Sequence, residues 1–211
     1  LIEGWHLFEE AVQAGVRIEK IFALESHRDQ LAAFPQTVWV SEEILRDLAD
    51  TQTPQGIVAV IQKEEMGQPD LRQGKFLFLE DVQDPGNVGT MIRTADAAGF
   101  TGVIISDKSA DVYSLKTLRS MQGSHFHLPI YRMPVATFVE GAKKSDLPIL
   151  ATTLSRESKD YRELSPLEDF VLVMGNEGQG ISSVMAESAD QLVHISMKGR
   201  AESLNVAVAA G

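Results

Sequence analysis

The 211-residue chain has 44% hydrophobic and 23% charged residues, which fits one large or two small globular domains. It contains no cysteine, so disulfides, cysteine–zinc sites and thiol nucleophiles are excluded, and its longest apolar runs are far too short to span a bilayer. The net charge of −11 argues against nonspecific binding along nucleic acid but is compatible with a local basic patch. The expected location is the cytoplasm.

The first 63 residues predict a small α/β unit. Leu1, Trp5, Phe8 and Val12 recur at helical spacing, and Gly15 supplies a stop. Because the chain starts inside this amphipathic pattern, we expect a further segment upstream. The remaining elements expected in this unit are strands at 21–24, 38–40 and 56–62, a polar helix at 27–33, and a helix capped by Ser41.

Residues 64–74 are polar, contain Pro and Gly and show no periodicity, which is typical of an interdomain linker. The second unit, residues 75–211, alternates apolar strands with helices. Because the strands are apolar on both faces, we expect a mostly parallel sheet covered by helices on both sides. The expected strands are 75–82, 102–106, 128–131, 149–153, 170–174 and 192–196, and the expected helices are 88–98, 114–121, 135–143 and 182–188.

A polar junction follows the first strand of the second unit. Asp84-Pro85-Gly86 predicts a tight turn, and Asn87 stands at the expected N-cap of the next helix. Arg93 lies on a helical stripe between the small residues Gly89 and Ala97. The pattern is compatible with a surface arginine beside a routine turn, or with an anion-binding corner in which the guanidinium holds a phosphate.

A second junction follows the strand at 170–174. Its glycines at positions 175, 178 and 180 permit close backbone approach, but their spacing matches neither the dinucleotide fingerprint nor a phosphate-binding P-loop. A structural turn and a cofactor loop are both compatible with the pattern. Glu177 among these glycines can hold a ribose hydroxyl or lie near a cation.

The third junction runs from Ile195 to Gly211. Ser203 stands at the expected N-cap of a final helix, and capping alone does not account for Asn205. Since all three junctions follow strands, we expect them to converge at one end of the sheet, where α/β proteins bind ligands. His125 and His127 alternate as they would on a strand but lack a third ligand of suitable spacing, so no metal site is expected.

The three junctions together resemble the signature motifs of the SpoU-type RNA 2′-O-ribose methyltransferases of the SPOUT superfamily. The matching runs, in the family's order, are Asp84-Pro-Gly-Asn-Val-Gly with Arg93-Thr-Ala, Met174-Gly-Asn-Glu-Gly-Gln-Gly-Ile, and Ile195-Ser-Met with Ser203-Leu-Asn-Val. The first unit resembles the L30e-like substrate-binding domain through Glu3-Gly-Trp-His-Leu-Phe-Glu-Glu-Ala and Thr53-Pro-Gln-Gly-Ile. Ser196 and Ala207 depart from the family's usual Pro and Ser, and the last helix is expected to be truncated at Gly211.

This resemblance implies S-adenosylmethionine as methyl donor, an obligate homodimer and a deep trefoil knot near the C-terminus. The catalytic residues that it implies are Asn87, Arg93, Glu177, Ser203 and Asn205. The cofactor contacts that it implies, largely through backbone groups, are Gly175, Ile195 and Leu204, with Thr152 and Met197 as neighbours.

The implied reaction is methylation of a ribose 2′-hydroxyl in RNA. 23S ribosomal RNA is the preferred substrate, because the L30e-like domain commonly accompanies ribosomal substrates, and transfer RNA is the alternative. A non-catalytic RNA-binding relative and a base methyltransferase remain rivals, whereas the missing dinucleotide fingerprint disfavours a dehydrogenase. No membrane and no metal are expected as partners.

Overall fold

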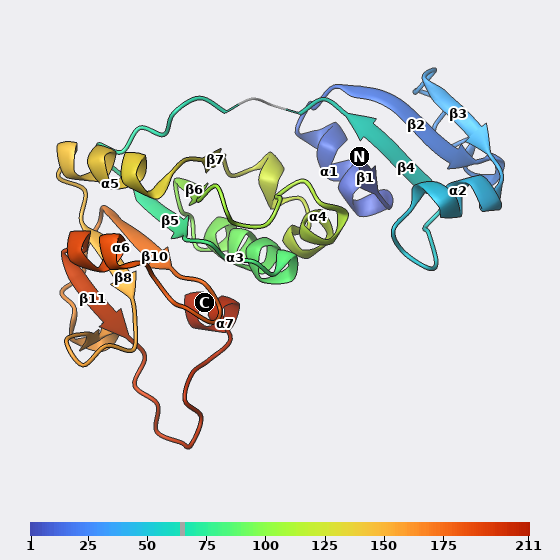
Figure 1. The fold of residues 1–211 in the computed structure, drawn as a ribbon. Coiled ribbons are helices and arrows are strands. Elements are labelled where there is room, and N and C mark those ends of the chain that lie inside the picture. Colours follow the sequence, from blue (N-terminus) through green and yellow to red (C-terminus); the bar gives the residue numbers. More distant parts are fainter. Residues whose placement is uncertain (64–65) are drawn as a thin grey trace.

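The computed structural model describes residues 1–63 and 66–211 and arranges them around two β-sheets (Figure 1). The smaller sheet has the strand order β1-β4-β2-β3, and the larger has the order β7-β6-β5-β10-β8-β11-β9. The strands are β1 (Ile2–Glu3), β2 (Ile18–Leu24), β3 (Thr37–Val40), β4 (Ile57–Ile61), β5 (Lys75–Leu79), β6 (Gly102–Ile105), β7 (Ile130–Arg132), β8 (Ile149–Thr152), β9 (Lys159–Asp160), β10 (Phe170–Met174) and β11 (Gln191–His194). The α-helices are α1 (Trp5–Gln13), α2 (Glu42–Leu48), α3 (Pro85–Ala97), α4 (Leu115–Met121), α5 (Val135–Lys144), α6 (Ser183–Ser188) and α7 (Val206–Ala210).

The N-terminal unit, residues 1–63, begins with a strand where the sequence pattern predicts a helix. Residues 2 and 3 pair with β4 as an antiparallel strand, and Gly4, at φ 90°, turns the chain into α1. Leu1 and Val12 are therefore exposed, and the buried stripe of α1 consists of Leu7, Phe8 and Ala11.

The polar helix expected at residues 27–33 is wrong. The segment forms a single 3₁₀ turn, η1 (Glu25–His27), followed by hydrogen-bonded turns. Pro35 disfavours helical backbone angles at Phe34 before it, which leaves too few residues for a cooperative α-helix. The other predicted elements of this unit are present, including α2, whose N-cap Ser41 accepts a hydrogen bond from a backbone N–H.

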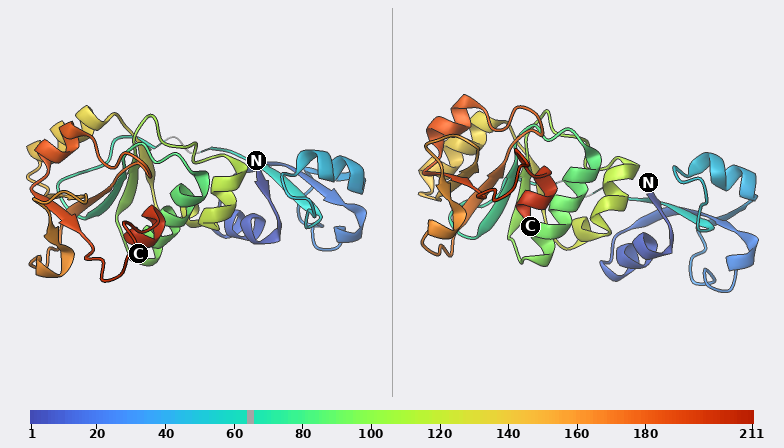
Figure 2. Two further views of the ribbon diagram at one scale, coloured as in Figure 1. Left: turned by 60° about the horizontal axis from the view of Figure 1, so that its bottom comes forward. Right: turned by 90° about the horizontal axis from the view of Figure 1, so that it is seen from below.

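The larger sheet confirms the predicted parallel architecture, since all of its strand pairs are parallel. Successive side chains of β5 enter two different cores. Leu77 and Leu79 belong to the cluster with α3, α4 and α7, whereas Phe76 and Phe78 pack with α5 and α6. Figure 2 shows helices on both faces of this sheet. Burial on both faces explains why these strands read as continuous apolar runs.

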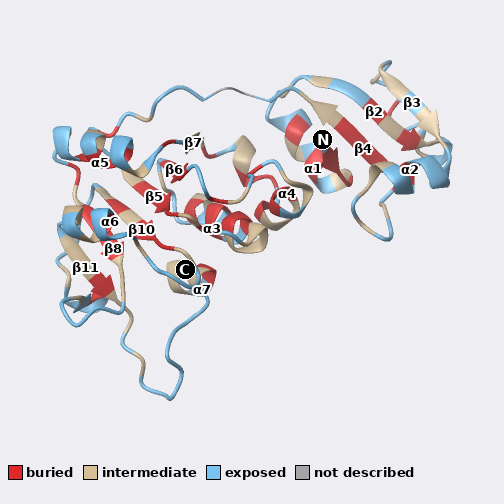
Figure 3. Cartoon of the chain, viewed as in Figure 1, coloured by how far each residue is buried: buried red, intermediate tan, exposed pale blue. Residues whose placement is uncertain are grey.

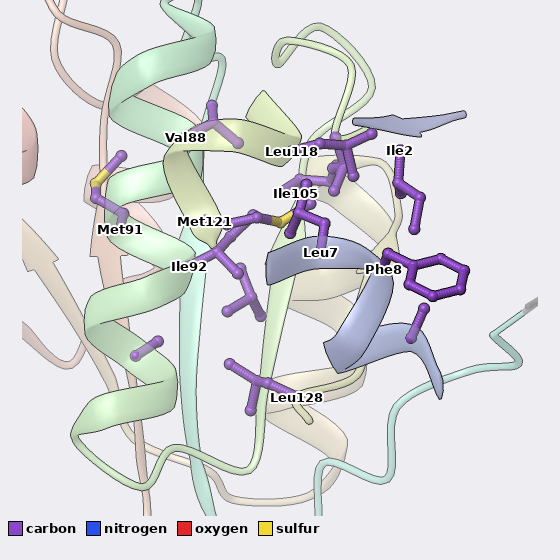
Figure 4. Packing of buried hydrophobic residues seen from close by; sticks show 14 of the residues in the cluster. Ile2, Leu7, Phe8, Val88, Met91, Ile92, Ile105, Leu118, Met121 and Leu128 are labelled. Carbon is purple, nitrogen blue, oxygen red and sulfur yellow. The ribbon is translucent and has the colours of Figure 1, made fainter. Parts of the chain in front are cut away.

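The hydrophobic core continues from the larger sheet into the N-terminal unit (Figure 4). Phe8 of α1 belongs to the same buried cluster as Met121 of α4. An ion pair of 2.7 Å between Arg119 and Asp50 crosses the same boundary. Of the predicted linker, residues 64 and 65 lie outside the described residues, and residues 66–74 form no helix or strand.

The two histidines expected on a strand lie instead at a turn. Gln122 and Gly123 adopt positive φ at the end of α4 and lead into the 3₁₀ turn η2 (Ser124–Phe126). His127 follows this turn and contacts two carboxylates, and the ring nitrogens of His125 are buried. Within the described residues, no group of three or more metal-ligating side chains is present. The same part of the chain contains no helix with the length and apolarity needed to cross a bilayer.

Candidate active site

Polar loops follow neighbouring parallel strands at one edge of the larger sheet. β8 lies between β10 and β11, and β10 also pairs with β5. Thr152, Gly175 and Ile195 stand at or directly after the ends of β8, β10 and β11. Three of the five predicted cofactor residues therefore share the carboxyl edge of the sheet, which is where open α/β sheets bind ligands.

Glu177 ties the loop after β10 to the loop after β5. Its carboxylate accepts hydrogen bonds from the backbone N–H of Gln83 at 3.0 Å, the backbone N–H of Asp84 at 2.9 Å and the side-chain amide of Asn87 at 3.1 Å. Burial by itself would raise the pKa of Glu177, but these hydrogen bonds hold the pKa below its ordinary value of 4.5. Glu177 is therefore a charged anchor between two loops.

Asn87 and Asn205 join the third junction to the same place. Asn205 donates a side-chain N–H to Oδ1 of Asn87 at 3.0 Å. The Oδ1 atom of Asn205 accepts from the backbone N–H of Ala207 at 2.9 Å and of Val208 at 3.3 Å, and so caps α7. We call Glu177, Asn87 and Asn205 the anchor chain. Its two side-chain bonds connect positions 90 and 118 residues apart in sequence.

Both helix N-caps predicted at these junctions are wrong by two or three residues. Asp84 caps α3, with Pro85 at the start of the helix, and Asn205 caps α7 in place of Ser203. Asp, Asn and Ser are nearly equivalent as N-caps, so a sequence with two candidates close together does not distinguish them. The side chain of Asn87, relieved of capping, is available to Glu177 and Asn205.

The loop after β10 closes on itself. Asn176 and Gly180 exchange backbone hydrogen bonds of 3.0 and 2.9 Å, and the Asn176 side chain donates to the carbonyl of Asp81 at 2.8 Å. A Cβ atom at Gly175 would lie 2.5 Å from the backbone nitrogen of Ile181. The glycine is therefore required by the close approach of two backbone segments.

Glu80 and Asn176 also hold loops in place at this edge, and neither was predicted as a site residue. Glu80, only 2% exposed, accepts a hydrogen bond from the backbone N–H of Ser182 at 3.1 Å and so fixes the start of α6. The sequence signal for Glu80 is a carboxylate directly after an apolar strand. Asn176 carries no comparable signal, because its role depends on the distant carbonyl of Asp81.

Ser203, Leu204 and Met197 lie on the segment between β11 and α7. In Figure 1 this segment runs away from the sheet before it returns to α7, and Figure 3 shows most of it exposed. The hydrogen bonds described for the anchor chain do not include Ser203. The structure thus brings together Asn87, Glu177 and Asn205 of the predicted catalytic set.

Arg93 lies on another face of α3. Six residues after Asn87, it is about 9 Å further along the helix axis and about 120° around it. Its side chain is exposed and lines a cavity of about 500 Å³ together with His6 and Glu10 of α1 and Asp96 of α3. This cavity does not include Asn87, Glu177 or Asn205, and the role of Arg93 in the reaction stays a prediction.

A family model described as the SpoU rRNA Methylase family matches residues 74–211, and a model described as an MRM3-like substrate binding domain matches residues 1–59. The chain belongs to the SpoU rRNA methylase family. This SpoU family member is 41% identical over 212 residues to the 23S rRNA (guanosine(2553)-2′-O)-methyltransferase RlmP of Bacillus subtilis (strain 168). The alignment covers 100% of this chain and 84% of that protein.

Solved structures of the SpoU family share the fold over almost the whole chain. The AdoMet-bound rRNA methyltransferase from Sinorhizobium meliloti is 33% identical with a TM-score of 0.87, over 99% of this chain and 82% of that one. The SpoU methyltransferase AviRb from Streptomyces viridochromogenes, in complex with the cofactor AdoMet, is 29% identical with a TM-score of 0.86, over 99% and 85% of the two chains. The predicted α/β fold class and the interpretation of the motifs are therefore confirmed.

The carboxyl edge of this SpoU family member suits a nucleoside-containing cofactor. Thr152, Gly175 and Ile195, at or directly after the ends of β8, β10 and β11, are uncharged, and glycine at position 175 leaves backbone groups accessible to a ligand. Leu154 and Leu204, on the loops after β8 and β11, are 66% and 40% exposed. Apolar side chains beside accessible backbone groups are the surroundings that small-molecule sites provide. Leu154 was not among the predicted cofactor residues.

Proposed function

We propose that this SpoU family member transfers a methyl group from S-adenosylmethionine to a ribose 2′-hydroxyl of 23S ribosomal RNA. The single observation that carries the proposal is the anchor chain, because it joins all three motif segments at the carboxyl edge of one sheet. The RlmP relative supports the reaction and the substrate, and the AdoMet-bound neighbours support the cofactor.

The cofactor residues are the backbone of Gly175, Ile195 and Leu204, with Thr152 and Met197 beside them. When bound, S-adenosylmethionine supplies a methyl group on a positively charged sulfonium, so its neutral leaving group needs no acid. The Thr152 hydroxyl donates to the carbonyl of Val173 at 2.8 Å, which fixes the end of β8 against β10. Adjacent loops are thereby held rigid where the cofactor must be oriented.

The 2′-hydroxyl is only weakly acidic, so its attack on the methyl group requires a group that removes its proton or stabilises the developing negative charge. Glu177 already accepts three hydrogen bonds, so we assign it to anchoring the loops and not to proton transfer. Asn205 and Ser203 provide polar groups near the ribose. A guanidinium group is a poor general base, and we therefore assign Arg93 to holding the RNA phosphate and stabilising developing charge, with the proton of the 2′-hydroxyl leaving to phosphate or water.

The position of Arg93 leads us to extend the proposal to a homodimer in which Arg93 of one subunit faces the anchor chain of the other. Exposed apolar side chains beside the anchor chain support a second copy there, since Val208 is 64% and Leu204 is 40% exposed. Co-expressing Arg93→Ala and Asn205→Ala subunits tests this arrangement, because each mixed dimer then holds one complete site. Restored turnover is expected, and two variants that stay inactive when mixed would exclude it.

The proposal also covers the organisation of the chain. We assign residues 1–63 to RNA binding, 64–74 to a linker and 75–211 to a catalytic domain with a trefoil knot. The separate family match over residues 1–59 supports the first assignment. A substrate in the ribosome and a chain without cysteine support a cytoplasmic location.

Incubation of the purified protein with labelled S-adenosylmethionine and deproteinised RNA from a deletion strain tests the reaction. Nuclease P1 digestion with mass spectrometry separates ribose from base methylation, and the fraction that carries the label separates ribosomal from transfer RNA. Cofactor binding by calorimetry without methylation of any RNA would favour a non-catalytic relative.

A further inference from the structure

A second cavity lies on the carboxyl edge of the larger sheet, beyond the residues assigned to methyl transfer. It has a volume of about 330 Å³ at the ends of β6 and β7, and the lining residues that matter here are Lys63, Asp111, Tyr113, Tyr131 and Arg132. We propose that this cavity binds one unpaired nucleobase of the substrate RNA, a few nucleotides from the methylated ribose. The inference rests on the proposed function, which makes RNA the ligand.

The cavity offers an aromatic ring with a cation over one of its faces. Tyr113 is 39% exposed, and the Nζ atom of Lys63 lies 4.4 Å from the centroid of its ring. Unpaired bases stack on tyrosine rings in RNA complexes. We infer that the base takes the face opposite Lys63 or displaces the ammonium, which then contacts the attached phosphate. Tyr131 adds a second aromatic side chain to the wall.

The polar groups of the cavity are held in place before any ligand arrives. Arg132 donates from Nη1 to the carbonyls of Ser106 at 2.9 Å and Asp107 at 3.0 Å. Its Nη2 atom donates to the carbonyl of Ala110 at 3.3 Å. Within the described residues no carboxylate forms an ion pair with Arg132, so its positive charge is not neutralised by a carboxylate there. Asp111 accepts from the backbone N–H of Tyr113 at 2.9 Å, which fixes the carboxylate beside the ring, and a carboxylate can accept from the N–H donors of a base.

The cavity and the anchor chain are connected through one glutamine. Gln83 donates its backbone N–H to Glu177 at 3.0 Å and its side-chain N–H to the carbonyl of Lys108 at 2.7 Å. Lys108 belongs to the same loop, after β6, whose carbonyls hold Arg132. In the order β7-β6-β5-β10, three strand spacings separate the two places, about 14 Å. A single strand of RNA therefore reaches both along one edge.

Charge supports RNA as the occupant. The chain carries a net charge of −11, which disfavours binding of a polyanion over most of its surface. Among the described residues that line the cavity, Lys63 and Arg132 stand against one carboxylate, that of Asp111. The cavity is a local exception on the edge to which we assign RNA binding.

Tyr113→Ala is the decisive variant, measured by filter binding to deproteinised 23S rRNA from a deletion strain. Loss of one base stack should weaken binding roughly 5- to 140-fold, the stacking free energy of one base converted at 1.4 kcal/mol per tenfold. Tyr113→Phe keeps the ring and should retain the affinity. Tyr161→Ala is the matched control, because Tyr161 is 53% exposed beside β9, at the opposite end of the sheet. Affinity for S-adenosylmethionine and the unfolding temperature should stay unchanged in all three.

Wild-type RNA affinity in a Tyr113→Ala protein that still binds S-adenosylmethionine would overturn the inference. Binding of free GMP at this cavity, with no effect of the variant on RNA, would overturn it too, because the site would then serve a free nucleotide. If Tyr113→Ala does not fold, photo-crosslinking of wild-type protein to rRNA containing 4-thiouridine replaces it. Crosslinks in the peptides of Tyr113 or Tyr131 support the inference, and crosslinks confined to other peptides reject it. RNA binding that depends on Tyr113 in a protein that methylates no RNA would instead refute the proposed function alone.

Discussion

Replacing Glu177 by glutamine tests whether the three motif segments are held together by one carboxylate. In the wild-type chain, Oε1 accepts from the N–H of Asp84 and the amide of Asn87, and Oε2 accepts from the N–H of Gln83. Glutamine keeps the shape but presents one NH₂ group to these donors. At least one hydrogen bond is lost, and those that remain lose the negative charge.

The expected cost follows from the strength of hydrogen bonds to charged groups, about 1.5–3 kcal/mol each when buried. Glu177 lies at the surface, and solvent screening places the loss in the free energy of unfolding at about 1–2 kcal/mol. For a chain of this size that corresponds to a fall in Tm of roughly 2–8 °C. Because folding lowers the pKa of Glu177, its contribution is fully present above pH 4.5 and is lost as the pH falls through the lower folded-state pKa.

Thermal unfolding at neutral pH and under acid conditions, together with S-adenosylmethionine affinity and methyl-transfer turnover, measures these effects. We expect a lower Tm only at the higher pH, weaker cofactor binding and at least a roughly tenfold loss of turnover, because the loops that orient both substrates separate. Glu187→Gln removes the same charge from an exposed position on α6 and serves as the control. A Glu177→Gln protein with full turnover and a Tm within about 1 °C of wild type would refute the role of the anchor chain.

Three further predictions concern other residues. Arg93→Ala should abolish methyl transfer while cofactor affinity by calorimetry stays at the wild-type value, and unchanged turnover would remove Arg93 from the reaction. Gly175→Ala should abolish cofactor binding and lower the Tm, because the added Cβ would lie 2.6 Å from the carbonyl oxygen of Gly180; a crystal structure with the loop unmoved would contradict this. Burial, with a smaller effect of nearby His127, lowers the pKa of His125 to about 4, so the unfolded chain takes up a proton below pH 6.5 and stability falls between pH 6.5 and 4. The expected loss in the free energy of unfolding is about 2 kcal/mol between pH 7 and 5, and His125→Leu should remove it. Chemical denaturation of both proteins at several pH values measures this. Equal pH dependence in the two would show that His125 is not buried as a neutral ring.

The strands of the second unit could be predicted from the sequence because each is apolar on both faces. This pattern does not depend on which strands are neighbours in the sheet. β10 matches its predicted bounds, Phe170–Met174, for this reason. The helix at 27–33 failed because a single proline limits how far a short polar segment can propagate. The N-caps failed because Asp84 and Asn87, or Ser203 and Asn205, are chemically equivalent until tertiary contacts choose between them.

The sequence by itself determined the alternation of elements, the three polar junctions and the family to which their motifs belong, since these depend on residue type and local spacing. Only the tertiary structure decided that Asn87, Glu177 and Asn205 meet while Arg93 faces a different cavity, because the order β5-β10-β8-β11 is set by packing between distant segments. The cavity around Tyr113 belongs to the same class of result. Its lining residues are scattered between positions 63 and 132, and no local sequence pattern predicts that they line the same cavity.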